Sequence, residues 1–193
     1  MKIAIIDYGA GNVKSVQFAL ERIGFSGFLT ASAREIESAD KVIFPGVGEA
    51  KTAMKALKEH GLDILIPQLK QDVLGICLGM QLMCEKSEEG ATDCLNIFPM
   101  VSMEFPEPLK IPHVGWNQIE NLKSNLLNGI SEDSYTYFVH SYYVPLSAFT
   151  IAESFYGFRF SSALAKDNFY ACQFHPEKSS DAGEQILQNF INL

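Results

Sequence analysis

The sequence Val73-Leu74-Gly75-Ile76-Cys77-Leu78-Gly79 sets the architecture of this chain. Residues 73–76 form an apolar run of strand length, and residues 78–86 then have the pattern of a helix. A cysteine between strand and helix, with a glycine two positions away on each side, has the spacing of a nucleophile elbow with cysteine in place of serine. The neighbours of such a tight turn must be small. We therefore predict an α/β sheet with a candidate nucleophile, Cys77, at its edge.

The same alternation of strand and helix continues through the first half of the chain. Apolar runs of strand length alternate with segments in which apolar residues recur every three or four positions and which end at glycines. The expected strands are residues 2–7, 26–30, 41–44 and 73–76, and the expected helices are residues 13–23, 49–60 and 78–86. Continuous apolar strands separated by helices indicate a mostly parallel sheet covered by helices on both faces.

The second half of the chain has a different pattern. Residues 97–120 and 135–173 carry short strand-like runs with turn residues between them, and residues 181–193 have the pattern of a capped helix. No repeat or linker interrupts the chain. We therefore expect one α/β domain over residues 1–193, with a small antiparallel annex in the second half.

Composition narrows the class of protein. The 193 residues are 47% hydrophobic, enough for one packed core, and the formal net charge is −8. An acidic chain is unsuited to non-specific nucleic-acid binding, and no apolar run is long enough for a membrane span or a signal peptide. The four cysteines include no CxxC pair, which argues against a zinc knuckle. We expect a cytoplasmic protein with free thiols, no metal and no cofactor.

A candidate base for Cys77 lies near the C-terminus, in Gln173-Phe174-His175-Pro176-Glu177. The helix N-terminus below Cys77 favours a thiolate, and such a nucleophile needs an imidazole to transfer protons. His175 and Glu177 are two positions apart, so in extended geometry both side chains lean the same way. Glu177 can then hold one tautomer of the imidazole and stabilise its charged form. Taken singly, these residues also fit a buried structural cysteine and a surface ion pair.

The other histidines and two glycine-rich turns are weaker candidates. His113 lies in a Pro/Gly-rich loop with no acid two residues away, while His60 and His140 look like a helix-end and a strand-end residue. Pro45-Gly46-Val47-Gly48 follows a strand, and it is either an ordinary turn or a source of backbone N–H groups for an oxyanion. Gly9-Ala10-Gly11-Asn12 lacks the third glycine of a dinucleotide fingerprint, so we expect no dinucleotide.

Taken together, the motifs resemble a known family. Three of them resemble the class I glutamine amidotransferases, whose triad is Cys-His-Glu: GICLGMQ (75–81), PGVG (45–48) and QFHPEKS (173–179). Four more resemble the glutaminase subunits of bacterial imidazole glycerol phosphate synthases: DYGAGN (7–12), KSEEG (86–90), IPHVGWN (111–117) and YFVHSYY (137–143). The resemblance spans nearly the whole chain. It implies a flavodoxin-like fold and glutamine hydrolysis in histidine biosynthesis.

The resemblance also implies roles for single residues. Cys77 would be the nucleophile, His175 the base and Glu177 its orienting acid. The oxyanion would be bound by backbone N–H groups of Gly46, Val47, Gly48 and Leu78. The substrate would be contacted by Gln81, Glu89, Ser141 and Tyr142, the last two mainly through their backbone. A cyclase subunit would be faced by Asn12, Trp116 and Lys178.

Chemistry independently favours a partner protein. Ammonia in neutral water is mostly ammonium, which is not nucleophilic, so a useful ammonia source should deliver its product through a dry passage to a bound acceptor. The chain is too small for an obvious second active site. By resemblance the partner is the cyclase subunit, which forms a heterodimer with the glutaminase and makes imidazole glycerol phosphate and AICAR.

Two positions depart from the family pattern. Cys94-Leu95-Asn96 stands where a Gly-Leu-Gly-like turn is usual, and Asp72 stands where a proline is usual before the strand. Neither belongs to the candidate triad, so we expect changes of local loop shape and not of chemistry.

Three other functions remain open at the level of sequence. The chain could be the glutaminase of a different synthase, such as a sugar-amidating one. A stand-alone cysteine hydrolase of the same fold, such as a γ-glutamyl hydrolase or a peptidase, would keep the triad and change its task. A non-catalytic flavodoxin-like binding module would carry Cys77 as a structural residue. Alkylation of Cys77 alone by a glutamine-analogue electrophile would separate the enzymes from the binding module.

Overall fold

A seven-stranded sheet forms the centre of the protein in the computed structural model, which describes residues 1–9 and 12–193. The strands are β1 (Ile3–Ile6), β2 (Gly27–Thr30), β3 (Lys41–Gly46), β4 (Asp72–Cys77), β11 (Thr150–Tyr156), β12 (Phe158–Lys166) and β13 (Phe169–Cys172). Their order is β11-β12-β13-β4-β3-β1-β2. Pairing is parallel from β13 to β2, whereas β11 and β12 are antiparallel. The predicted mostly parallel sheet with antiparallel strands from the second half is confirmed.

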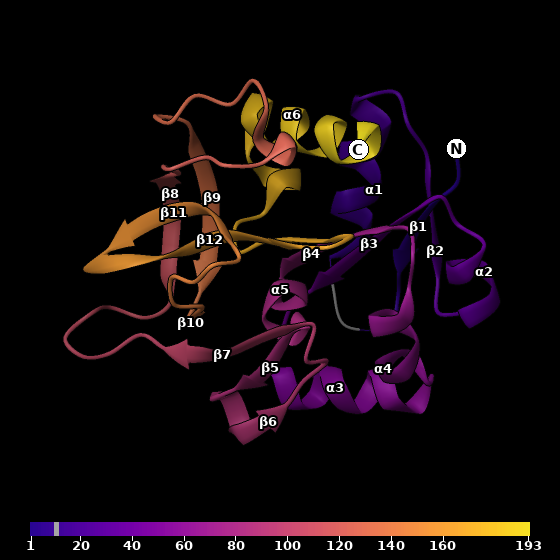
Figure 1. Cartoon of the computed structure of the whole chain (residues 1–193), viewed down its shortest axis with the longest axis horizontal. Helices are drawn as coiled ribbons and strands as arrows, with labels where there is room; N and C mark the ends of the chain where they lie inside the picture. Colours follow the sequence, from indigo (N-terminus) through magenta and orange to yellow (C-terminus); the bar gives the residue numbers. More distant parts are fainter. Residues whose placement is uncertain (10–11) are drawn as a thin grey trace.

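Helices cover both faces of this sheet (Figure 1). The α-helices are α1 (Val13–Arg22), α2 (Ala33–Glu37), α3 (Ala50–Glu59), α4 (Leu62–Leu65), α5 (Leu78–Met83) and α6 (Ser180–Asn192). Short 3₁₀ turns are η1 (Ile66–Gln68), η2 (Glu89–Ala91), η3 (Asn125–Leu127) and η4 (Pro176–Lys178). Among the described residues, no helix has both the length and the apolar character that crossing a membrane requires.

Alternation along the strands builds a separate hydrophobic core on each face of the sheet. In β1, Ile3 and Ile5 pack with the buried residues of α1 and α6. Ala4 and Ile6 point the opposite way and pack with the buried residues of α3, α4 and α5. Because both faces of β1 are covered, its sequence is apolar throughout and does not alternate with polar residues.

Two predicted boundaries near Cys77 were wrong. The helix that follows Cys77 ends at Met83, and β5 (Cys84–Ser87) takes its place because it pairs with β7 (Phe98–Glu104) in a second sheet. The strand before the glycine-rich turn does not stop at Phe44. It continues to Gly46, because Gly46 is in register with Cys77 of β4.

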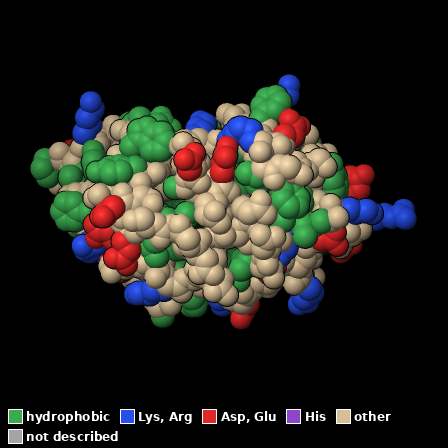
Figure 2. All heavy atoms as spheres, turned by 90° about the horizontal axis from the view of Figure 1, so that it is seen from above, with side chains coloured by type: hydrophobic (Ala, Val, Ile, Leu, Met, Phe, Trp, Pro, Cys, Tyr) green, Lys and Arg blue, Asp and Glu red, His purple; other side chains and the backbone are tan. Residues whose placement is uncertain are grey.

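Two smaller sheets extend beyond the main one. Strands β10 (Tyr142–Tyr143), β7, β5 and β6 (Thr92–Asp93) form a four-stranded sheet, while β8 (His113–Gln118) and β9 (Tyr135–His140) form an antiparallel ribbon. Phe138 packs the inner face of the ribbon on the main core. The outer face exposes Val114, Trp116 and Tyr135. Figure 2 shows hydrophobic side chains at the end of the molecule that carries β8, β9 and β11.

The two departures from the family pattern have local explanations. Asp72 begins β4 opposite Lys41 of β3, and their side chains form an ion pair in which Lys41 is only 7% exposed. The pair therefore joins the two strands at the edge remote from Cys77. Asn96 has a φ of 52°, a left-handed conformation that asparagine tolerates better than most residues. Asparagine thus meets a backbone requirement that glycine would also meet.

Candidate active site

Three segments that are distant in the sequence meet at the carboxyl edge of the main sheet. Strand β4 ends at Cys77 and lies between β3, which ends at Gly46, and β13, which ends at Cys172. Gly46 is in register with Cys77, and Cys172 is in register with Ile76. The chain that continues from β13 therefore passes beside Cys77 before it reaches His175. Parallel pairing thus explains why the predicted nucleophile and the predicted base come together.

Cys77 occupies a strained turn between β4 and α5. Its φ is 54° and its ψ is −110°, a region that residues with side chains rarely adopt. Close packing explains the flanking glycines. A Cβ atom on Gly79 would lie 2.0 Å from the carbonyl oxygen of Phe44, and one on Gly75 would lie 2.8 Å from the sulfur of Met83. Small residues are therefore needed because helix α5 lies directly against the sheet.

His175 and Glu177 form a buried pair. Nδ1 of His175 lies 2.8 Å from Oε1 of Glu177, and the two residues are 2% and 7% exposed. The contact is made across the 3₁₀ turn η4, so the extended geometry predicted for this segment was wrong. The backbone of His175 is held on both sides. Its N–H donates to the carbonyl of Tyr137 at 2.9 Å, and its carbonyl accepts from the hydroxyl of Ser179 at 2.6 Å.

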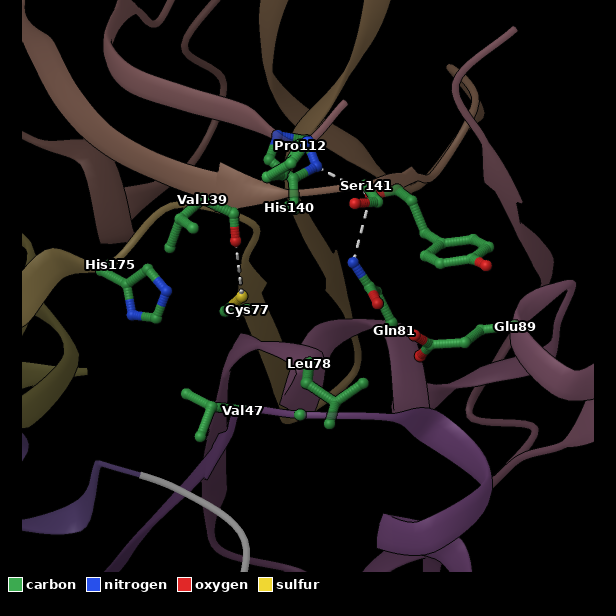
Figure 3. A pocket seen from close by; sticks show the side chains of 12 residues that line it. Val47, Cys77, Leu78, Gln81, Glu89, Pro112, Val139, His140, Ser141 and His175 are labelled. Carbon is green, nitrogen blue, oxygen red and sulfur yellow. Dashed lines mark hydrogen bonds between the residues drawn. The ribbon is translucent and has the colours of Figure 1, made fainter. Parts of the chain in front are cut away.

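The second nitrogen of His175 is available to Cys77. This Nε2 is buried and has no hydrogen-bond partner within residues 1–9 and 12–193, and His175 lines the same pocket as Cys77 (Figure 3). Burial lowers the pKa of His175, but interactions with Cys77 and Glu177 outweigh it and raise the pKa to about 10. A charged imidazole in this pocket can give a proton to a leaving group.

Stability should depend on pH through His175. Because its pKa is raised from 6.5 to about 10 on folding, the stabilisation is fully present below pH 6.5 and is lost as the pH rises toward 10. We expect the difference in free energy of unfolding between wild type and His175→Asn, measured in urea, to be smaller at pH 9.5 than at pH 6. The exposed His60 provides the control, His60→Asn. A difference that grew with pH would contradict a charged His175.

A pocket of about 280 Å³ opens beside Cys77. This is slightly below the range of drug-sized sites, about 300–1,000 Å³, and suits a ligand of amino-acid size. All the residues expected to contact the substrate line it, and so do three of the residues expected to bind the oxyanion: Gln81, Glu89, Ser141, Tyr142, Val47, Gly48 and Leu78. Gly46, the buried last residue of β3, does not line the pocket.

Glu89 presents a carboxylate on the wall of this pocket. Its Oε2 accepts a hydrogen bond from the backbone N–H of Ala50 at 2.7 Å, at the start of α3. Burial raises the pKa of Glu89, and the bond from Ala50 acts in the opposite direction. A carboxylate at a helix N-terminus is stabilised by the helix dipole. Glu89 is therefore a fixed acidic group in the site and not part of a solvated charge run.

Two amide side chains connect the pocket wall to the sulfur. Nε2 of Gln81 donates to the carbonyl of Tyr142 at 3.1 Å and to Oε1 of Gln173 at 3.0 Å. Nε2 of Gln173 then lies 3.8 Å from the sulfur of Cys77. The carbonyl oxygen of Val139 is a further neighbour of this sulfur, also at 3.8 Å.

Two polar residues at the site were not predicted from the sequence. Gln173 is two residues before His175, and residues at this spacing in an extended segment face the same way. This spacing is the one sequence signal that Gln173 belongs to the site. His140 lines the pocket directly before Ser141. Its sequence context indicates only an ordinary strand-end residue, since a histidine without an acid nearby in the sequence gives no local sign of a site.

The remaining candidates lie outside the pocket. His113 is buried, pairs with His140 and does not line the pocket that contains Cys77. His60 is exposed at the end of α3, as expected. Residues 10–11 of the glycine-rich turn after β1 fall outside the described residues, so the absence of dinucleotide binding stays a prediction.

The residues expected to face a partner are exposed. Asn12 lies at the start of α1, and Trp116 lies on the outer face of the ribbon with 52% of its surface exposed. The ring of Trp116 meets the ring of Tyr137 edge-on, with 6.0 Å between centroids. Nζ of Lys178 lies 5.9 Å from the same Tyr137 ring. Trp116, Tyr137 and Lys178 therefore form one continuous surface.

A family model and two named proteins with similar sequences point to the same family. The family model for glutamine amidotransferase class-I matches residues 4–193. An imidazole glycerol phosphate synthase subunit HisH from Bacteroides fragilis is 57% identical over 196 residues, which cover 100% of both chains. A subunit of the same name from Haemophilus influenzae is 47% identical over 193 residues, which cover 99% of this chain and 97% of that protein.

Solved structures share the fold at much lower identity. A structure described as a glutamine amidotransferase has a TM-score of 0.78 at 16% identity and covers 98% of this chain and 97% of its own. A chain of PurLQS from Thermotoga maritima has a TM-score of 0.76 at 13% identity, with 99% and 97% covered. Full-length similarity in sequence is more specific than this likeness of fold. The chain belongs to the class I glutamine amidotransferases and, among them, to the HisH subunits of imidazole glycerol phosphate synthase.

Proposed function

We propose that this chain hydrolyses L-glutamine at Cys77 and supplies the ammonia to a cyclase subunit in the cytoplasm. The observation that carries the proposal is the buried His175–Glu177 pair, whose free Nε2 shares a pocket with the strained Cys77. We also propose that residues 1–193 act as one domain, since the main sheet combines strands from both halves of the chain.

The chemistry follows from the positions of the triad. The Cys77 thiolate attacks the side-chain amide carbon of glutamine, and the charge that develops on the oxygen is stabilised by backbone N–H groups of Leu78, Val47 and Gly48. His175 gives its Nε2 proton to the departing ammonia, which leaves a glutamyl thioester on Cys77. Water then attacks the thioester while His175 takes a proton from it, and glutamate leaves as the thiolate forms again. Throughout, Glu177 holds the tautomer of His175.

Recognition of the substrate is divided between the two ends of the pocket. Glu89 offers a carboxylate for the α-ammonium group of glutamine, with its Oε2 already fixed by Ala50. Gln81 and the backbone of Ser141 and Tyr142 line the wall between Glu89 and Cys77. Because the Tyr142 carbonyl already accepts two hydrogen bonds, that residue is left with its N–H for the substrate.

The partner surface is the outer face of the ribbon together with the turn that carries Lys178. Val114 and Trp116 supply exposed apolar area, Lys178 supplies a charge beside Tyr137, and the exposed Asn12 supplies a further polar group. Exposed aromatic residues beside a charged residue are typical of binding surfaces. The cyclase would cover this surface, receive ammonia before it is protonated in bulk water, and use it to make imidazole glycerol phosphate and AICAR.

A glutaminase assay with and without the cyclase subunit tests the proposal. We expect slow hydrolysis by the free chain and much faster hydrolysis when the cyclase and its ligand are present. Trp116→Ala should weaken the stimulation by the cyclase, whereas Ile64→Ala, at an exposed apolar residue on the remote helix α4, should not. Equal rates with and without cyclase would contradict the coupling, and no hydrolysis in either case would contradict the reaction.

A further inference from the structure

His113 and His140 form a buried pair that the triad does not use. They are directly opposite one another on β8 and β9, and Nδ1 of His113 lies 3.0 Å from Nε2 of His140. Their exposed fractions are 6% and 5%, so both rings lie on the inner face of the ribbon whose outer face carries Trp116. His140 reaches the pocket wall, as Figure 3 shows, whereas His113 does not line the pocket.

Backbone chemistry fixes the direction of each hydrogen bond in the pair. Nδ1 of His140 lies 2.7 Å from the carbonyl oxygen of Tyr142, which can only accept, so Nδ1 carries a hydrogen. Burial lowers the pKa of His140 to about 3 and that of His113 to about 4, so each neutral ring has one N–H. Nε2 of His140 must then accept, and Nδ1 of His113 must donate to it. Nε2 of His113 is left to accept from the amide of Asn117, 3.4 Å away.

The directed chain continues from Tyr142 to the nucleophile. The Tyr142 carbonyl accepts a second hydrogen bond from Nε2 of Gln81, and the same nitrogen donates to Oε1 of Gln173. Both hydrogens of the Gln81 amide are therefore used, and its Oε1 remains for a ligand. With its oxygen engaged, Gln173 turns its Nε2 toward the sulfur of Cys77 at 3.8 Å.

We propose that His113 and His140 are positioning residues, which hold the Tyr142 carbonyl in place and thereby fix the amide orientations of Gln81 and Gln173. The inference rests on the proposed function, because it gives the pair a task in glutamine binding and thiolate formation at that site. In this orientation Gln81 offers an acceptor that selects a nitrogen donor on the substrate. Gln173 offers a donor to the thiolate. The reversed amides would turn oxygen lone pairs toward the negative sulfur.

Packing alone does not account for this pair. The His113 ring is stacked on Tyr156, with 4.2 Å between centroids, and Phe105 packs against His140 at 5.2 Å. Apolar side chains would fill such an aromatic cluster without the cost of burying polar nitrogen atoms. Each imidazole donates a hydrogen bond through Nδ1 and accepts one through Nε2. The pair therefore fixes the orientation of its polar neighbours as well as filling space. Phe105, which touches both rings without a hydrogen bond, is the matched control for packing.

Glutaminase kinetics in the presence of the cyclase subunit measure the effect on the substrate. His140→Leu removes the donor to Tyr142, and the KM for glutamine should rise about tenfold with a smaller change in kcat. His140→Asn places an amide N–H where Nδ1 stood, so it should recover most of the wild-type KM. Phe105→Leu should lower the Tm without raising KM. An unchanged KM in a folded His140→Leu variant would overturn the inference.

Nitrogen-15 NMR of the imidazoles tests the pair without any assay of activity. Both His113 and His140 in the full chain should be neutral with the hydrogen on Nδ1, and their signals should not titrate between pH 6 and 8. A hydrogen on Nε2 of either ring would break the directed chain and overturn the inference. A wild-type chain that failed to hydrolyse glutamine with its cyclase would contradict the proposed function instead, and the NMR result would still decide whether the chain is directed.

Discussion

Cys77→Ala should lower the rate of glutamine hydrolysis by about 10⁴-fold or more, because the covalent route through the thioester is lost. Alanine keeps the Cβ atom of the elbow, so the turn at φ 54° and the glycine packing around it are unchanged. The loss should therefore appear in kcat. Release of glutamate by the variant, measured with the cyclase present, gives the result directly.

Two controls make the Cys77→Ala result specific. Cys94→Ala changes a thiol that does not line the pocket, so it should hydrolyse glutamine at the wild-type rate. The synthase reaction with Cys77→Ala should still proceed when ammonium salts are added, since the ammonia source alone is removed. Retention of more than about a tenth of the wild-type rate by Cys77→Ala would contradict a nucleophilic role.

Glu177→Gln should lower kcat by about 10³–10⁴-fold while KM for glutamine changes little. The carboxylate accepts from Nδ1 of His175 at 2.8 Å and stabilises the charged ring. A glutamine can instead turn its NH₂ group toward Nδ1, which permits the wrong tautomer and removes the negative charge. The raised pKa of His175 should fall as well, because Glu177 is one of its causes. NMR titration of His175 in the variant measures that shift.

Glu184→Gln is the matched control for Glu177→Gln. Glu184 lies on α6 in an exposed ion pair with Arg22 at 2.6 Å, so the same chemical change there should leave hydrolysis unaffected. If Glu177→Gln hydrolysed glutamine as fast as the Glu184→Gln control, Glu177 would have no part in the reaction.

Local patterns in the sequence predicted the main sheet well, because its strands are buried on both faces and its helices are amphipathic. The apolar run at 2–7 is β1 (Ile3–Ile6), and the periodic segment at 49–60 is α3 (Ala50–Glu59). The elbow at Cys77 was predicted from its glycines, whose need for space the structure explains through contacts with Phe44 and Met83. These features depend on residues that are close together in the chain.

What the sequence could not predict depends on pairing between distant segments. Residues 84–87 form a strand because β7 lies beside them, and no local signal marks that pairing. Gln173 belongs to the site through its contact with Cys77, and His140 is placed there by its pairing with His113 across the ribbon, so both depend on residues far away in the chain. Contacts of this kind join residues at no fixed spacing, so no sequence pattern marks the polar residues that make them.

The family assignment narrows the functions that the sequence left open. The relatives from Bacteroides fragilis and Haemophilus influenzae, which match this chain over nearly its full length, are named as HisH subunits of imidazole glycerol phosphate synthase. A binding module with a structural cysteine would not need the buried His175–Glu177 pair beside Cys77. The pair instead stabilises the charge on which the proposed reaction depends.

Selective alkylation asks whether one sulfur of this protein differs from the others. Burial raises the pKa of Cys84, Cys94 and Cys172, so these thiols remain protonated and slow to react at neutral pH. A glutamine-analogue electrophile, followed by mass spectrometry of the digested chain, should modify Cys77 alone, and free glutamine should protect it. Modification of all four cysteines, or of none, would contradict an activated thiolate at Cys77.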